Sequence, residues 1–214
     1  MVPHRSHSSA VDALLVVADE ALRVLAGVAT ARRESPGEGE PEVAAEAIRR
    51  ESAALMRVNH TGEICAQALY SGQALTSTNP ELKSKLDGAA REEIEHLAWT
   101  ERRLDELGSR TSLLNPLWYA GSFAIGALAG LAGDRWNLGF LSETERQVEQ
   151  HLGSHLDRLP TDDSRSRAIV AQMRNDEAGH AQMAEDSGAA RLPLPIRTAM
   201  RLTAKVMTTT TYRI

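Results

Sequence analysis

The chain has 214 residues, a formal net charge of −5, 42% apolar residues and only 4% aromatic residues. This length fits one domain that can bury a sizeable core. Helix formers such as Ala, Leu, Glu and Arg dominate and β-branched runs are scarce, which predicts an all-α protein. The acidic balance, without a basic stripe interleaved with aromatics, argues against nucleic acid as a partner.

The cysteine content bounds the chemistry further. Cys65 is the single cysteine of the chain, which excludes an internal disulfide framework, a cysteine zinc cage and an iron–sulfur cluster. A reducing cytoplasm is the expected compartment. The first ten residues lack the charged start and the apolar run of a signal peptide.

Three regions are expected along the chain. Residues 11–28 predict an amphipathic helix and residues 32–42, rich in Pro, Gly and acids, predict a linker or exposed loop. We therefore expect an N-terminal helix with an acidic linker at 1–42, a metal-binding four-helix bundle at 43–190 and a basic amphipathic segment at 191–214. The apolar face of the first helix consists of Val11, Leu14, Leu15, Ala18, Leu22 and Leu25.

The motif E-x-x-H occurs twice, at residues 93–96 and 177–180. Residues i and i+3 share one face of an α-helix, so each motif places a carboxylate beside an imidazole. Hard oxygen donors next to imidazoles suit iron or manganese, and two facing pairs suit two metal ions. All four residues fall within apolar helical stripes, where an unpaired carboxylate is costly.

A helical hairpin supplies a partner for the first motif. Residues 77–80 predict a turn in which Asn79 caps the next helix and Pro80 opens it. If the two helices fold back antiparallel, reflection through position 78 sets Glu63 at the height of Glu93. The helix before the turn is expected from about 43 to 75.

The second motif repeats this arrangement. Reflection through the turn at 160–163 sets Glu145 opposite Glu177, whereas Glu149 reflects to a position one helical turn away and ranks second. The two Glu-to-motif separations are 30 and 32 residues. We therefore predict a ferritin-like bundle of two helical hairpins joined by an apolar crossover helix, with additional terminal helices. The expected metal ligands are Glu63, Glu93, His96, Glu145, Glu177 and His180.

Other polar residues allow weaker predictions. An isolated buried Glu–His pair is more often structural than metal-ligating, but six inward polar residues at mirrored heights favour the metal interpretation. Asp176 is expected to brace the opposite histidine and Tyr70 to fill core space or hydrogen-bond at the site. His151 and His155 either orient a ligand or lie on the surface. Five further acids are expected to be solvated: Glu92, Glu95, Glu101, Glu143 and Glu149.

The apolar crossover is expected at residues 111–140, and its part 111–133 contains no charged residue. A single membrane crossing there would put the two halves of the metal site on opposite sides of a bilayer. We expect the segment to lie on a membrane, to dip into it or to cover the bundle, with a buried core helix as the alternative. Gly126 and Gly130 permit close helix contact. The expected interfacial anchors are Trp118, Tyr119 and Trp136.

The C-terminal segment supports a membrane contact. Residues 188–214 contain no acid, and their basic residues alternate with apolar ones, a composition that suits an anionic lipid surface. We therefore expect peripheral attachment to the cytoplasmic face of the cell membrane through 111–140 and 191–214. The basic residues are Arg191, Arg197, Arg201, Lys205 and Arg213.

Several longer strings resemble a known family. RVNHTGE at 57–63, EEIEHLAW at 92–99, LGSR at 107–110, Asn115-Pro116, AKVM at 204–207 and the final TYRI are similar to the bacterial demethoxyubiquinone hydroxylases of coenzyme Q biosynthesis. The resemblance runs from about residue 57 to the C-terminus. The six ligands that it implies fall on the six residues predicted above.

The resemblance implies a di-iron monooxygenase. With two iron ions and O2, it would hydroxylate the ring of a polyprenyl-methoxy-methyl-benzoquinol. This quinol substrate would reach the protein from the membrane. No nucleotide-binding G-x-G-x-x-G after a strand is apparent, so an external electron donor is expected. A homo-oligomer and contacts with other ubiquinone-biosynthesis proteins stay open. The alternatives are a ferritin-like ferroxidase or iron-storage protein and a scaffold without catalysis.

Overall fold

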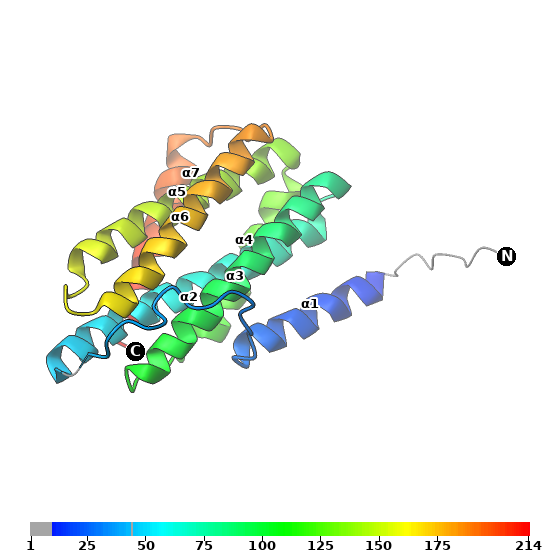
Figure 1. Ribbon diagram of the computed structural model, residues 1–214. Helices are drawn as coiled ribbons and strands as arrows, with labels where there is room; N and C mark the ends of the chain where they lie inside the picture. The colour runs from blue at the N-terminus through cyan, green and yellow to red at the C-terminus, as the bar shows by residue number, and fades with distance from the viewer. Residues whose placement is uncertain (1–9, 44) are drawn as a thin grey trace.

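The computed structural model describes the backbone of residues 10–43 and 45–214, and their side chains except those of residues 10, 11, 13 and 14. This part contains seven α-helices and no strand (Figure 1), as the sequence predicts. The predicted apolar-face residues Val11 and Leu14 therefore lie outside the described side chains. The helices are α1 (Ala10–Leu25), α2 (Glu46–Thr76), α3 (Pro80–Glu106), α4 (Asn115–Leu131), α5 (Asp134–Arg158), α6 (Ser164–Asp186) and α7 (Leu194–Thr211).

Helices α2, α3, α5 and α6 form the bundle, in which α2 packs on α3 and α5 packs on α6 (Figure 1). The predicted turn between α2 and α3 is confirmed: the Asn79 side chain accepts two N–H groups of the first turn, and Pro80 opens the helix. Asp163 caps α6, where its side chain accepts the backbone N–H of Ser166. It also forms a buried ion pair of 2.9 Å with Arg103 on α3, which links the two hairpins.

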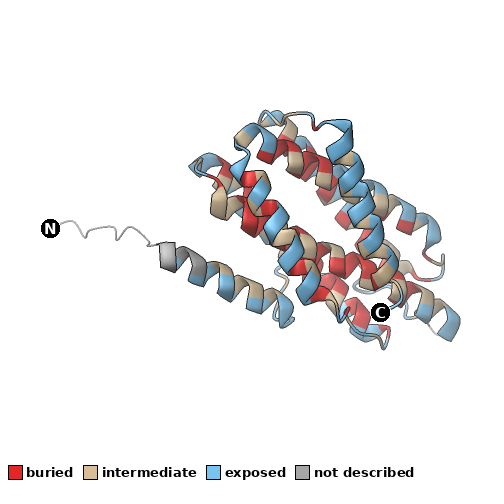
Figure 2. Ribbon diagram, turned by 180° about the vertical axis from the view of Figure 1, so that it is seen from behind, coloured by how far each residue is buried: buried red, intermediate tan, exposed pale blue. Residues whose placement is uncertain are grey.

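Two apolar clusters fill the bundle, one toward each end. Figure 2 shows the buried residues on the facing sides of the helices and the exposed residues on their outer sides. Burying each large apolar side chain contributes about 1.5–3 kcal/mol. One cluster contains Leu55, Met56, Trp99, Leu104, Leu152, Ile169, Val170 and Met173. The other contains Tyr70, Leu82, Leu86, Leu138, Leu141 and Ala184.

Helix α4 packs lengthwise on α2. The predicted close contact at Gly126 is confirmed, because a methyl group there would overlap the carbonyl oxygen of Leu69. Gly72 on α2 is the matching position, where a methyl group would overlap the backbone of α4 at Phe123 and Ala127. The two backbones approach this closely only because both helices carry glycine at the crossing.

The outer face of α4 is apolar and exposed, so α4 is not the buried core helix of the alternative interpretation. Leu128 is 67% exposed, and Leu117 and Leu131 are similarly exposed. Of the predicted interfacial anchors, Trp136 is exposed but Tyr119 is buried. No helix of the described chain has the length and hydropathy that crossing a bilayer requires.

The apolar segment 111–140 is not one helix. It is divided at Gly133, whose φ of 96° lies in the left-handed region that favours glycine. Within it, Asn115–Leu131 form α4, and residues from Asp134 onward form the first turns of α5. Residues 134–140, which were expected to belong to the crossover, therefore contribute to the bundle.

Residues 29–43, which we call the strap, run from α1 across the bundle to α2 (Figure 1). The backbone N–H groups of Arg32 and Arg33 donate to the Glu95 carboxylate at 2.8–3.1 Å. The prediction that Glu95 is solvated is therefore wrong, since the strap covers it. The expected exposed linker is in fact anchored on α3.

Helix α7 packs against α2 and α5. Arg197 donates to the Glu143 carboxylate at 2.7 Å, and Glu143 is buried by this contact. The prediction that Glu143 is solvated is therefore wrong as well. Arg197, which was expected to face lipid, therefore pairs with Glu143 of the same chain.

Candidate metal centre

The structure brings all six predicted ligand side chains into one layer between the two apolar clusters. Each of the six is at most 6% exposed. Their potential ligand atoms form two overlapping groups, and the atoms within each group lie within 4.8 Å of one another. Glu93 and Glu177 belong to both groups. Glu63 and His96 complete one group, and Glu145 and His180 complete the other.

Both histidines point Nδ1 into this layer. His96 Nδ1 lies 3.1 Å from Glu93, 3.6 Å from Glu63 and 3.5 Å from Glu177. His180 Nδ1 lies 3.3 Å from Glu93 and 3.3 Å from Glu177. These pairs follow from the i, i+3 spacing within each helix and from the antiparallel hairpins that face the two motifs.

Each histidine directs Nε2 outward to another carboxylate. His96 Nε2 lies 3.0 Å from Asp176 Oδ2, which confirms that Asp176 braces the opposite histidine. His180 Nε2 lies 3.3 Å from Glu92 Oε2. The prediction that Glu92 is solvated is therefore incomplete, since its side chain is 51% exposed yet contacts the site. In both cases the contacting acid directly precedes a shared glutamate in the sequence.

The choice of Glu145 over Glu149 agrees with the geometry. Glu145 lies in the buried layer, and its Oε1 accepts a 2.6 Å hydrogen bond from the Tyr70 hydroxyl. Glu149 instead points to Arg174, 3.6 Å away, outside the layer. Burial and the Glu145 carboxylate raise the pKa of Tyr70, so Tyr70 keeps its proton and donates it to this bond.

The electrostatics of the layer require positive charge. Burial and the neighbouring Glu93 raise the pKa of Glu63 well above its usual value, and burial together with Glu177 does the same for the pKa of Glu145. Burial opposes charging His180, but hydrogen bonds to Glu177 and Glu93 raise its pKa to about 12. Without metal, the layer must therefore hold protons to offset its carboxylates.

The donor set fits a pair of cations. A carboxylate accepts at each Nε2, so a neutral imidazole carries its proton there and points the Nδ1 lone pair at other carboxylate oxygens. Lone pairs facing one another repel unless a proton or a metal ion lies between them. Glu93 Oε1 is buried and has no hydrogen-bond partner, although His180 Nδ1 lies 3.3 Å away. A metal ion in each group would satisfy all of these atoms.

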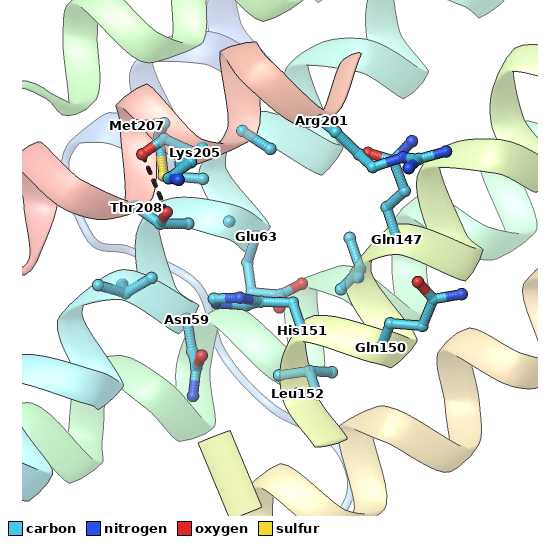
Figure 3. A pocket seen from close by; sticks show the side chains of 14 residues that line it. Asn59, Glu63, Gln147, Gln150, His151, Leu152, Arg201, Lys205, Met207 and Thr208 are labelled. Atoms are coloured by element: carbon cyan, nitrogen blue, oxygen red, sulfur yellow. Dashed lines mark hydrogen bonds between the residues drawn. The ribbon is translucent and has the colours of Figure 1, made fainter. Parts of the chain in front are cut away.

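A cavity of about 370 Å³ opens beside the layer, between α2, α5 and α7 (Figure 3). Glu63 and His151 reach toward its centre, and Asn59 lines the α2 side. Buried Asn59 Oδ1 and His151 Nε2 have no hydrogen-bond partner. Sequence reasoning missed this cavity, because its α7 wall, with Arg201 and Lys205, comes from a helix with no motif to connect it to the site.

His151 lines this cavity and contacts His155 behind it, with ring centroids 4.0 Å apart and ring planes tilted by 57°. Burial lowers the pKa of His151 to about 4 and the pKa of His155 to about 3. Both imidazoles are therefore neutral at physiological pH. Neither of them belongs to the groups of potential metal ligands.

Comparison with known proteins decides the family. The model of the family described as Ubiquinone biosynthesis protein COQ7 matches residues 50–211. The chain is 61% identical over 202 residues to the 3-demethoxyubiquinol 3-hydroxylase of Nitrosospira multiformis, covering 94% of this chain and 97% of the relative. The chain belongs to the COQ7 family. The family resemblance inferred from the sequence strings is thereby confirmed.

Other COQ7-family relatives agree. The enzyme of the same name from Nitrosomonas europaea is 59% identical over 203 residues, with 94% of this chain and 98% of the relative covered. That from an Azoarcus species is 57% identical over 204 residues, with 95% and 99% covered. The match to the COQ7 model contains all six residues of the layer, α7 and the bundle except for the first four residues of α2, whereas the strap lies before its first residue.

Proposed function

We propose that the chain is a di-iron monooxygenase that hydroxylates the ring of a demethoxyubiquinol during ubiquinone biosynthesis. The observation that carries the proposal is the overlap of two buried Glu/His groups at Glu93 and Glu177. Four carboxylates would balance the charge of two Fe²⁺ ions in a layer that otherwise has to hold protons. Membership of the COQ7 family and the names of its relatives supply the reaction.

Each residue of the layer has a role in this proposal. Glu63 with His96, and Glu145 with His180, would hold one ion each, and Glu93 and Glu177, which belong to both groups, would contribute to both sites. The chemistry that iron supplies when bound is the two-electron activation of O2. The apolar clusters on both sides keep water out, and Tyr70 fixes one oxygen of Glu145.

The net reaction needs an electron source. One oxygen atom of O2 enters the ring as a hydroxyl group, and the other leaves as water with two electrons and two protons from a donor. We propose an external donor, because the described residues contain seven helices and no strand on which a nucleotide-binding βαβ unit could be built.

The cavity beside Glu63 is the proposed binding place of the quinol ring. Asn59 Oδ1 is a buried acceptor without a donor, and a quinol hydroxyl group is such a donor. Its neighbour Glu63 belongs to the metal layer, so a ring bound here lies next to the ligands. The unpaired Nε2 of His151 can receive the second polar contact of the ring.

The polyprenyl substrate supports a proposed peripheral location at the cytoplasmic face of the cell membrane. Exposed apolar residues gather on α4 and on α7, where Leu202 and Val206 are open. Helix α7 also forms one wall of the cavity, so a quinol could pass from a lipid surface at α7 to Glu63. An oligomer of this chain and contacts with other enzymes of the pathway stay predictions.

Paired carboxylate variants test the function. Iron-loaded protein, a reductant and a short-tailed demethoxyubiquinol should give the hydroxylated quinol, measured by mass spectrometry. Glu145→Ala should abolish product, whereas Glu149→Ala, one helical turn away and outside the layer, should retain most of it. Full activity of Glu145→Ala with loss in Glu149→Ala would overturn the ligand assignment. Oxidation of Fe²⁺ by wild-type protein without quinol product would favour the ferroxidase alternative.

A further inference from the structure

The strap is attached to α3 at Glu95 and Trp99, close to His96 on the same helix. The backbone N–H groups of Arg32 and Arg33 both donate to Glu95, one residue before His96. Trp99 Nε1 donates to the carbonyl oxygen of Arg33 at 3.4 Å. The Arg33 guanidinium lies over the Trp99 ring, 4.7 Å from its centroid. These contacts hold the backbone of Arg33 on α3 and place its side chain, which is 43% exposed, over Trp99.

The rest of the strap is attached as well. Glu38 pairs with Arg102 on α3 at 3.1 Å, and the carbonyl oxygen of Glu40 accepts from Arg165 on α6. Gly37 packs so closely on α6 that a methyl group would overlap the backbone of Arg165. The strap therefore follows the surface of α3 and α6 over most of its length.

Arg33 connects the strap to the metal layer. Its guanidinium donates to Asp176 Oδ2 at 3.1 Å, the same oxygen that lies 3.0 Å from His96 Nε2. Gln172 donates to the other oxygen, Asp176 Oδ1, at 2.8 Å. The carboxylate that braces His96 is thus held from two sides, and its side chain is only 13% exposed.

The second histidine has a weaker brace. His180 Nε2 contacts Glu92 at the longer distance of 3.3 Å, and the Glu92 side chain is 51% exposed. Water competes for an exposed carboxylate, so Glu92 fixes its histidine less firmly than Asp176 does. The two Glu/His groups thus contain the same kinds of side chain, but the carboxylate that contacts Nε2 is held more firmly at His96 than at His180.

We propose that Arg33 is a positioning residue that holds Asp176, and through it His96, in the orientation for metal binding; this inference rests on the proposed metal-binding function. Partners that hydrogen-bond the far nitrogen of a ligating histidine fix its tautomer and ring orientation. Arg33 lies before the first residue that the COQ7 model matches. The strap thus adds a contact from outside the matched region, and it makes the His96 position the tighter of the two.

Metal binding by the full chain tests this proposal. Metal-free protein is titrated anaerobically with Co²⁺, whose visible absorption reports the ligand geometry. Wild-type protein should bind two ions. Arg33→Ala should weaken one of the two sites about tenfold and change its absorption band while the other site stays the same. Arg32→Ala is the matched control, because it removes the neighbouring cation and leaves both backbone donors to Glu95 in place.

A second variant locates the effect. Asp176→Asn should weaken the same site, and adding Arg33→Ala to it should cause little further loss, since both changes act on one contact. The melting temperature of the metal-free variants shows whether each is folded. Identical isotherms for wild type and Arg33→Ala would overturn the positioning role alone. Equal weakening of both sites would also overturn it, whereas wild-type protein that binds no metal would overturn the proposed function.

Discussion

Glu93 and Glu177 face each other from α3 and α6, and each directs one carboxylate oxygen toward His96 Nδ1 and the other toward His180 Nδ1. The distances are 3.1 and 3.3 Å for Glu93 and 3.5 and 3.3 Å for Glu177. A carboxylate placed in this way can contact two metal ions at once. Glu63 and Glu145 each belong to one group only, so two of the four carboxylates are common to both groups and two are not.

This difference predicts unequal effects on metal content. Glu93→Ala removes a ligand from both groups and should lower bound iron from about two ions per chain to well below one. Glu63→Ala removes a ligand from one group and should leave about one ion bound. Iron is measured after anaerobic loading and gel filtration. Equal iron content in the two variants would contradict the shared role of Glu93.

A buried histidine outside the layer predicts acid sensitivity. His60 on α2 is 3% exposed, and burial lowers its pKa from 6.5 to about 4. Its folded-state pKa is below its unfolded-state pKa, so the unfolded chain binds a proton first and stability is lost as pH falls from about 6.5 toward 4. By linkage, the loss at pH 5 is about 2 kcal/mol.

The variant His60→Gln isolates this effect, because glutamine does not titrate. Between pH 7.5 and pH 5, the metal-free wild-type protein should lose about 2 kcal/mol more unfolding free energy than the variant. Urea unfolding at both pH values measures the difference. The same loss in both proteins would show that His60 already binds its proton in the folded state or is accessible to water.

The contact between α4 and α2 predicts a contrast between two glycines of one helix. A methyl group at Gly126 would overlap the Leu69 carbonyl oxygen, whereas nothing lies within 4 Å of the corresponding position at Gly121. Gly126→Ala should therefore destabilise the protein by about 1–3 kcal/mol. Gly121→Ala should be neutral or stabilising by up to about 1 kcal/mol, because alanine favours a helix. Thermal unfolding compares them, and similar losses in both would contradict the close approach at Gly126.

The exposed apolar face of α4 predicts membrane binding. Leu128→Glu places a charge at a side chain that is 67% exposed, so it should weaken flotation with anionic liposomes without lowering the melting temperature. Activity on a short-tailed quinol should largely survive. Thr161→Glu adds the same charge in the exposed α5–α6 turn and serves as the control. Equal flotation of both variants would show that α4 does not touch the lipid surface.

Local periodicity was sufficient to predict the bundle and to bring the six residues of the layer together in it. Helices in a hairpin keep residues at equal heights, so the turns at 77–80 and 160–163 located Glu63 and Glu145 by reflection. The close helix contact at Gly126 could also be predicted, from its spacing to Gly130. Its partner Gly72 could not, because spacing within α4 does not show which helix it meets.

The errors share one physical cause. Glu95 and Glu143 were predicted to be solvated because they flank apolar stripes, but the strap and α7 bury them through contacts with Arg33 and Arg197. Such contacts join segments far apart in the chain, and no helical period encodes them. The cavity beside Glu63 was missed for the same reason, since α7 provides one of its walls.

The central claim is that the layer around Glu93 and Glu177 uses O2 to hydroxylate a quinol ring. The most direct measurement is a single turnover in which reduced, iron-loaded protein with bound demethoxyubiquinol is mixed with ¹⁸O2 and the product mass is determined. We predict that the hydroxylated quinol carries one ¹⁸O atom and that Glu177→Ala gives no product. A product that takes its oxygen from water, or unchanged quinol beside oxidised iron, would contradict a monooxygenase at this layer.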